Sequence, residues 1–242
     1  MRIWVGIPAY DGKICVSTAR SLTSEIQLSA MFGHNIKVTY LPGCSVITHA
    51  RNQLVKQFLD DEWRADKMVF IDSDVGWEPG SLMKLATYNK DVIAGIYRFK
   101  IPEESYPMGF FTKKGEAEIE DGLITVAGCP MGFTAISRNA FERFMEHYPE
   151  RAYEFLGVKT HCFFENPFVP ETPKLPASLV GEDVAFGFRW REMGGKIWVD
   201  PDMKLIHSNG LTEYGGCLGE YLRARGAEYT IPGDNPASNK AA

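Results

Sequence analysis

Residues 67–74 read Lys-Met-Val-Phe-Ile-Asp-Ser-Asp, an apolar run that ends in two carboxylates. A short run of this kind predicts a buried strand over 67–71. Two carboxylates two residues apart, just past such a strand, can turn toward one ion, and their hard oxygen atoms suit Mg²⁺ or Mn²⁺ bridging to a diphosphate. An Asp-x-Asp triplet also occurs in ordinary polar turns, so its surroundings must decide between the two interpretations.

Two β-α units precede this strand. An apolar run over 2–9 predicts a strand, and helical spacing follows over 14–31 at Ile14, Ala19, Leu22, Ile26 and Ala30. Residues 36–41 alternate like a second strand, and Ser45 is placed to cap a helix over 46–60. Strands that alternate with helices predict a parallel sheet, which binds ligands beyond the carboxyl ends of its strands.

The pattern changes in the second half of the chain. After a helix from 78 to about 88 and a strand over 91–97, short strands are expected over 109–112, 117–120 and 123–126, followed by a helix over 138–148. Four prolines with aromatic neighbours predict an irregular loop over 157–180. A helix over 182–193 and a strand over 197–199 complete the pattern, which is that of an α/β fold.

We expect one domain over residues 1–242. Within it, 1–100 form a nucleotide-binding half, 101–210 an acceptor half, and 211–242 a C-terminal extension. Single cores stop growing at roughly 250 to 300 residues, which agrees with one domain.

Composition excludes several classes of protein. Hydrophobic residues make up 45% and charged residues 24%, values typical of globular domains. A net charge of −5 gives no sign of the basic surface that general nucleic-acid binding requires. Five cysteines without paired short spacings argue against a disulfide framework or a zinc knuckle. Asp11 comes too early for a signal peptide, and no apolar run reaches the roughly 18 residues of a membrane span. We therefore expect a cytoplasmic protein without stable membrane insertion.

The order of landmarks from about residue 3 to 210 resembles the large inverting family of nucleotide-sugar transferases with the GT-A fold. Its members have a mainly parallel mixed sheet with helices on both faces. The resemblance rests on these segments: Pro8-Ala9-Tyr10-Asp11, similar to the family's Pro-x-Tyr-Asn segment with Asp11 in place of Asn; Ala50-Arg51-Asn52; Phe70-Ile71-Asp72-Ser73-Asp74; Gly128-Cys129-Pro130-Met131-Gly132-Phe133; Gly181-Glu182-Asp183; and His207.

The resemblance implies a role for each matched residue. Contacts to the donor are implied for Pro8, Tyr10, Asp11, Arg51, Asn52, Asp72 and Ser73. Ligation of Mn²⁺ or Mg²⁺ is implied for Asp72, Asp74 and His207. Asp183 is implied as the general base, and Glu182 as a second catalytic or acceptor-holding group.

Each role competes with a simpler explanation. An acidic residue such as Asp183 in the first turn of a helix is favoured by the helix dipole alone. A lone histidine such as His207 is often a structural residue. Arg51 either reaches a phosphate or cross-links Asp72 or Asp74, and Tyr10 either stacks on a base or belongs to the core.

The resemblance implies a metal-dependent glycosyltransferase that acts with inversion. A uridine diphosphate sugar is the family's commonest donor. The acceptor stays open among a glycan, a lipid-linked glycan and a modified DNA base, since similar segments occur in transferases of bacteria and their phages. Two alternatives remain: a phosphohydrolase of the haloacid dehalogenase type, in which Asp72 would attack phosphorus, and a non-catalytic module that binds nucleotide sugars.

Overall fold

The computed structural model describes residues 1–107, 117–155, 157–171 and 176–226. Within these residues an eight-stranded sheet has the order β2-β1-β3-β8-β5-β13-β7-β6. Its strands are β1 (Arg2–Pro8), β2 (Asn35–Leu41), β3 (Lys67–Ile71), β5 (Val92–Ala94), β6 (Ile119–Glu120), β7 (Leu123–Val126), β8 (Phe133–Ser137) and β13 (Ile197–Val199).

Most strands of this sheet run in one direction. The strands β1, β2 and β3 pair in parallel, as do β5 and β13, whereas β8 is antiparallel to both β3 and β5, and β7 is antiparallel to β13 and β6. The predicted mainly parallel, mixed α/β sheet is therefore confirmed. The strand β8, which follows a glycine-rich segment and lies in the middle of the sheet, was not predicted from the sequence.

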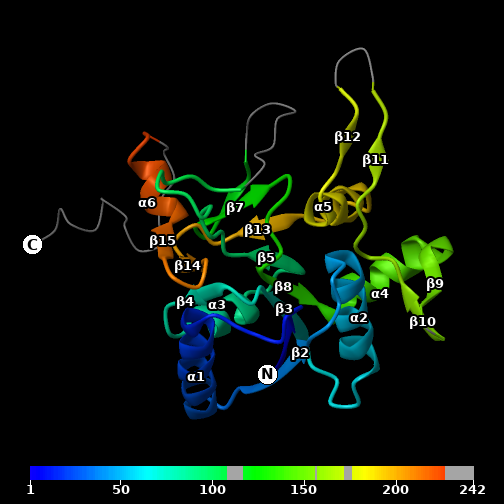
Figure 1. Cartoon of the computed structure of the whole chain (residues 1–242), viewed down its shortest axis with the longest axis horizontal. Coiled ribbons are helices and arrows are strands. Elements are labelled where there is room, and N and C mark those ends of the chain that lie inside the picture. Colours follow the sequence, from blue (N-terminus) through cyan, green and yellow to red (C-terminus); the bar gives the residue numbers. More distant parts are fainter. Residues whose placement is uncertain (108–116, 156, 172–175, 227–242) are drawn as a thin grey trace, which may run out of the picture.

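Two apolar cores cover the two faces of the sheet, because neighbouring residues of a strand point to opposite sides. Met68 and Phe70 of β3 join one core, and Val69 and Ile71 join the other. The first core packs on α2 (Ile47–Asp60), α4 (Arg138–His147) and α5 (Glu182–Glu192), and the second on α1 (Val16–Met31) and α3 (Ser81–Thr87). Helices thus lie on both faces, as expected, and Figure 1 shows α1 and α2 on opposite sides of the strands.

The described residues also form three smaller sheets. The strands β4 (Val75–Trp77), β14 (Lys204–Ser208) and β15 (Glu213–Cys217) form one three-stranded sheet, and α6 (Leu218–Arg223) follows it. Two hairpins pair β9 (Ala152–Phe155) with β10 (Val158–His161), and β11 (Phe168–Val169) with β12 (Ser178–Leu179). The second hairpin projects from the body beside α5 in Figure 1.

Three local predictions need correction. Ser45 does not cap α2, whose N-cap is Val46, without a side-chain hydrogen bond. The loop expected over 157–180 contains β10, β11 and β12, because backbone pairing across two hairpins supplies hydrogen bonds that the proline-rich pattern does not reveal. The strand expected over 91–97 ends at Ala94, and the one expected over 109–112 lies outside the described residues.

The buried face of α1 also differs from the predicted apolar face. Ile26 is exposed, whereas Glu25 is completely buried. The carboxylate of Glu25 accepts hydrogen bonds from Trp77 Nε1 at 3.0 Å and from the backbone N–H groups of Gly80 and Met83 at 2.9 Å each. A buried carboxylate is tolerated when such donors surround it, so polar partners on β4 and α3 decide which face of α1 packs inward.

Candidate functional site

The carboxyl edge of the sheet gathers most of the predicted site residues. Asp72, Ser73 and Asp74 follow β3, and Pro8 ends the adjacent β1. Because β8 runs the other way, Gly132 enters it from the same edge, where its carbonyl accepts a hydrogen bond from the Asp72 N–H at 3.0 Å. Neighbouring strands therefore bring separate segments together at this edge.

Both carboxylate oxygens of Asp72 are engaged. Oδ1 lies 3.0 Å from Nη2 of Arg51, and Oδ2 accepts a hydrogen bond of 3.1 Å from the hydroxyl of Tyr97. Gly132 leaves the space for this arrangement, since a Cβ there would lie 2.2 Å from Asp72 Oδ2 and 2.6 Å from the Tyr97 hydroxyl. Arg51 and Tyr97 thus hold the side chain of Asp72 in the space that Gly132 leaves open.

Arg51 joins the Asp-Ser-Asp triplet to the Glu-Asp pair. It is only 3% exposed, and its Nε lies 3.3 Å from Oε1 of Glu182, while Nη2 contacts Asp72. Burial by itself lowers the pKa of Arg51, but the adjacent carboxylates of Asp72 and Glu182 outweigh it and raise that pKa above its ordinary value. Of the two roles considered for Arg51, the structure shows the cross-link to Asp72.

Asp74 points to a different set of partners. Its Oδ2 forms an ion pair with Lys100, and its Oδ1 lies 3.6 Å from Nε2 of His207. Burial by itself raises the pKa of Asp74, but hydrogen bonds from His207 and Lys100 outweigh burial and hold that pKa below its usual value. The ring of Tyr97 packs on His207 with centroids 4.6 Å apart, so Tyr97 contacts both Asp72 and His207.

The donor atoms at Asp74 and His207 suit a divalent ion that is shared with a phosphate. Nδ1 of His207 donates to the carbonyl oxygen of Arg98 at 2.9 Å, and this contact orients the ring so that Nε2 faces Asp74. In the described part of the chain, no three His, Cys, Asp or Glu side chains lie close enough to hold a metal ion. Ions that bind substrate phosphates need only one or two protein ligands, so Asp74 and His207 fit such an ion. The third expected ligand, Asp72, contacts Arg51 and Tyr97, and its ligation of the ion stays a prediction.

A polar hollow of about 430 Å³ opens beside Asp74. Its lining comes from the segment after β1, the start of α1, the segment after β3, the segment after β5 and the end of β14: Asp11, Lys13, Ile14, Cys15, Val16, Ser73, Asp74, Lys100, Ser208, Asn209 and Gly210. Asp11 is exposed and forms an ion pair of 3.4 Å with Lys13. Tyr10 is 63% exposed, so it is not a core aromatic residue.

Glu182 and Asp183 begin α5. Oδ1 of Asp183 accepts a hydrogen bond of 2.7 Å from the N–H of Val184. Burial, followed by the negative charge of Glu182, raises the pKa of Asp183 above its ordinary value. Burial and the charge of Asp183 also raise the pKa of the Cys129 thiol to about 12. The start of α5 lies beside the segment that leads to Gly132, since a Cβ at Gly128 would be 3.9 Å from Val184.

The amide of Asn52 makes structural contacts, and its expected contact with a donor stays a prediction. Its Oδ1 accepts the N–H groups of Phe163 and Phe164 at 3.1 and 2.9 Å, and its Nδ2 donates to the Phe164 carbonyl at 2.9 Å. Its amide is therefore used to fix the segment before the β11–β12 hairpin. Tyr97 and Lys100 were not predicted as site residues; their sequence signal was their position at the end of the strand predicted over 91–97 and three residues past it.

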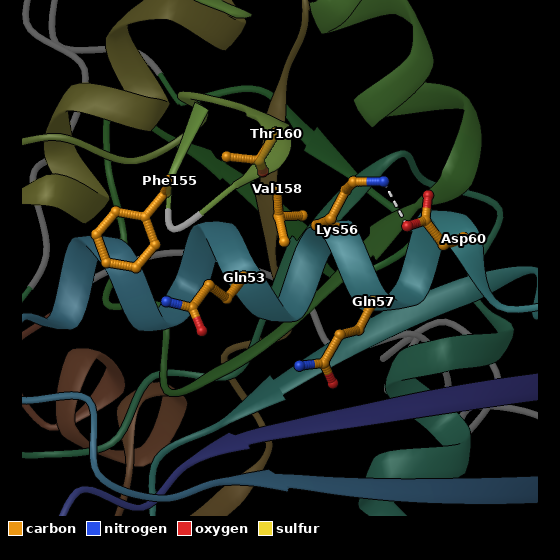
Figure 2. Close-up of a pocket in the computed structure, with 7 residues that line it drawn as sticks. All are labelled: Gln53, Lys56, Gln57, Asp60, Phe155, Val158 and Thr160. Atoms are coloured by element: carbon orange, nitrogen blue, oxygen red, sulfur yellow. Dashed lines mark hydrogen bonds and ion pairs between the residues drawn. The ribbon is translucent and has the colours of Figure 1, made fainter. Parts of the chain in front are cut away.

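A second hollow, of about 290 Å³, lies between α2 and the β9–β10 hairpin. Figure 2 shows Gln53, Gln57 and the Lys56–Asp60 ion pair on the helix, with Phe155, Val158 and Thr160 on the hairpin. It shares no lining residue with the hollow beside Asp74. None of the predicted site residues lines it.

Comparisons with known proteins bear on the fold. No protein-family model matches the chain, and no curated protein matches its sequence. Among solved structures, A197 from STIV has a TM-score of 0.51 at 22% identity, over 86% of each chain. A glycosyltransferase involved in the glycosylation of the major capsid of PBCV-1 has a TM-score of 0.33 at 14% identity, over 59% of this chain and 63% of the other.

A third solved structure is GalNAc-T7 with UDP, GalNAc and Mn²⁺. It has a TM-score of 0.49 at 12% identity, over 87% of this chain and 45% of its own. Of these three structures, A197 has a TM-score above 0.5, and its likeness shows a shared fold. No helix in the described part of the chain is both long and apolar enough to cross a bilayer.

Proposed function

We propose that the chain is a metal-dependent glycosyltransferase of the GT-A type, which moves a sugar from a nucleotide-sugar donor to an acceptor hydroxyl with inversion. The observation that carries this proposal is the buried guanidinium of Arg51, which contacts both Asp72 and Glu182. Through it, an Asp-x-Asp triplet and a Glu-Asp pair that lie far apart in the sequence meet at the carboxyl edge of one sheet. This is the edge at which open α/β sheets bind their ligands.

In the proposed reaction, the polar hollow beside Asp74 receives the diphosphate of the donor. Asp74 and His207 would hold Mn²⁺ or Mg²⁺, and the bound ion supplies positive charge that neutralises the departing diphosphate. Lys13 and Lys100 line the same hollow and add two ammonium groups. Asp11 and the exposed Tyr10 lie just after β1, and we propose that they contact the base and ribose of the donor.

Asp183 serves as the general base. It accepts the proton of the acceptor hydroxyl as the acceptor oxygen bonds to the anomeric carbon and the bond from that carbon to the diphosphate oxygen breaks. Its raised pKa suits this role, because a stronger base takes up a proton more readily. Glu182 is held by Arg51, which favours a positioning role for Glu182.

Of the two alternatives, the phosphohydrolase is disfavoured by the contacts of Asp72, and the non-catalytic binding module is open to test. A haloacid dehalogenase mechanism would use Asp72 as the nucleophile. Arg51 and Tyr97 contact its two oxygens, and these contacts draw away the negative charge that an attack on phosphorus needs. A non-catalytic binding module would bind the same donors without turnover, so measured turnover separates it from an enzyme.

The proposal is tested by thermal shift with nucleotide sugars, free nucleotides and sugar phosphates, each with Mn²⁺, Mg²⁺ or chelator. Ligands that bind the folded state raise the melting temperature. We expect a metal-dependent shift with a nucleotide sugar, a uridine diphosphate sugar first, and its loss in Asp74→Ala and weakening in His207→Ala. Release of nucleoside diphosphate, with candidate glycan, lipid-linked glycan and modified-DNA acceptors, then measures turnover. Absence of a shift with every nucleotide would contradict the proposal.

A further inference from the structure

Lys100 occupies the carboxylate that the proposed ion also needs. Its ammonium pairs with Oδ2 of Asp74, while His207 stands 3.6 Å from Oδ1. Both charged side chains of this pair are about one-third exposed, Lys100 at 32% and Asp74 at 28%. The pair therefore borders the polar hollow, and solvent or a ligand can reach it.

Hydrogen bonds hold the backbone around Lys100, and the ion pair with Asp74 holds its ammonium. On one side, the carbonyl of Arg98 faces Nδ1 of His207 at 2.9 Å, and the guanidinium of Arg98 donates to the carbonyls of Ile101 and Pro102 at 2.9 Å each. Beside it, the N–H of Phe99 donates to the carbonyl of Ser105 at 2.9 Å. A long, flexible lysine stem on such an anchored segment can move its ammonium without any backbone change.

Electrostatics does not favour both cations on one carboxylate. An ammonium and a divalent ion that contact the same group lie close enough to repel each other strongly, particularly in a partly buried site. An entering ion therefore displaces the ammonium. A diphosphate bound in the same hollow provides a new anionic partner within reach of Lys100.

We propose that Lys100 is the counter-cation of Asp74 when no metal is bound. Its ammonium neutralises this carboxylate, is displaced when the divalent ion binds, and then pairs with the donor's diphosphate. This inference rests on the proposed function. Lys100 is accordingly a positioning residue that couples metal binding to donor binding.

Two binding measurements on the full chain test the inference, because they are expected to change in opposite directions. Free Mn²⁺ is followed by electron paramagnetic resonance without nucleotide, and binding of uridine diphosphate is followed by calorimetry at saturating Mn²⁺. Lys100→Met is expected to bind Mn²⁺ about tenfold more tightly and the diphosphate about tenfold more weakly, a magnitude typical of coupling between adjacent ligands. Lys100→Arg, which keeps the charge, is expected to stay near the wild type in both.

Lys84→Met is the matched control. Lys84 also pairs with a buried carboxylate, that of Asp200 at 2.7 Å, but it does not line the hollow. Neither affinity is expected to change in this variant. Circular dichroism of Lys100→Met and of a second variant, Lys100→Gln, verifies that each is folded.

The outcomes separate the two proposals. If the wild type binds Mn²⁺ and the diphosphate but Lys100→Met changes both affinities in the same direction or neither, the role of Lys100 is overturned and the proposed function stands. If the wild type binds no nucleoside diphosphate at all, the proposed function fails and the inference fails with it.

Discussion

Nε of Arg51 lies 3.3 Å from Oε1 of Glu182, a residue 131 positions later in the chain. The same guanidinium contacts Asp72, so a single buried cation compensates two carboxylates from two separate motifs. Removing a partner from a buried ion pair leaves an uncompensated charge, which costs more than the pair itself contributes.

Arg51→Met is therefore expected to lower the free energy of unfolding by about 3 kcal/mol, measured by urea denaturation. It keeps the apolar stem and removes the charge that Asp72 and Glu182 require. Arg20→Met is the control, because Arg20 and Glu213 form an exposed pair of 3.3 Å whose loss should cost less than about 0.5 kcal/mol. Equal losses of unfolding free energy in the two variants would show that Asp72 and Glu182 do not depend on the charge of Arg51.

Gly132→Ala is expected to disturb the site directly. The added Cβ would stand 2.2 Å from Asp72 Oδ2, so Asp72 and Tyr97 must shift, at a cost of about 1 to 3 kcal/mol. Metal-dependent nucleotide binding, measured by calorimetry, should weaken together with the melting temperature. Gly128→Ala is the matched control, since the nearest atoms to a Cβ there are 3.9 Å away in Val184. If Gly132→Ala left nucleotide binding and the melting temperature unchanged while Gly128→Ala lowered both, the close approach of Gly132 to Asp72 would be refuted.

Asp183→Asn is expected to keep donor affinity and to slow sugar transfer by a factor of about 10² to 10⁴, the usual contribution of a general base. Calorimetry with the donor and a transfer assay measure the two effects separately. Glu192→Gln, at the other end of α5, is the control, because its carboxylate accepts a hydrogen bond from Tyr148 outside the proposed site. Near-normal transfer by folded Asp183→Asn would rule out Asp183 as the base.

The same substitution makes a prediction about stability and pH. The folded state raises the pKa of Asp183 above the ordinary 3.8, so folding favours the protonated form. The charged form then costs stability, a cost that is absent below the unfolded pKa and grows as pH rises through the folded pKa. Asp183→Asn should therefore unfold at higher urea concentration than the wild type at pH 7, and the advantage should vanish near pH 3. A constant difference across that range would contradict the raised pKa.

Lys67 provides a second pH test, far from the proposed chemistry. Its ammonium donates to the carbonyls of Tyr88 and Lys90, and burial lowers its pKa from 10.5 to about 8. The unfolded chain therefore holds this proton more tightly, so Lys67 reduces stability below pH 8, and the reduction fades as pH rises from 8 to 10.5. Urea titrations should show wild-type stability increasing relative to Lys67→Met over this interval. A parallel pH dependence in both proteins would mean that Lys67 titrates normally.

The sequence by itself determined the local elements that carry the site. Apolar runs predicted β1 and β3, and therefore placed Pro8 and the Asp72–Asp74 triplet at the carboxyl edge of a sheet. Helical patterning similarly placed Glu182 and Asp183 in the first turn of α5. These features depend on periodicity and on signals between near neighbours, which a single sequence contains.

Only the tertiary structure decided how these elements combine. It inserted β8 between β3 and β5, assigned Asn52 to the Phe164 backbone, and placed Lys100 on Asp74. It also turned Glu25 inward on α1, against the apolar pattern, because Trp77 and the start of α3 satisfy its carboxylate. Each of these outcomes depends on charge compensation or hydrogen bonding between groups far apart in the chain, and local residue patterns do not encode such contacts.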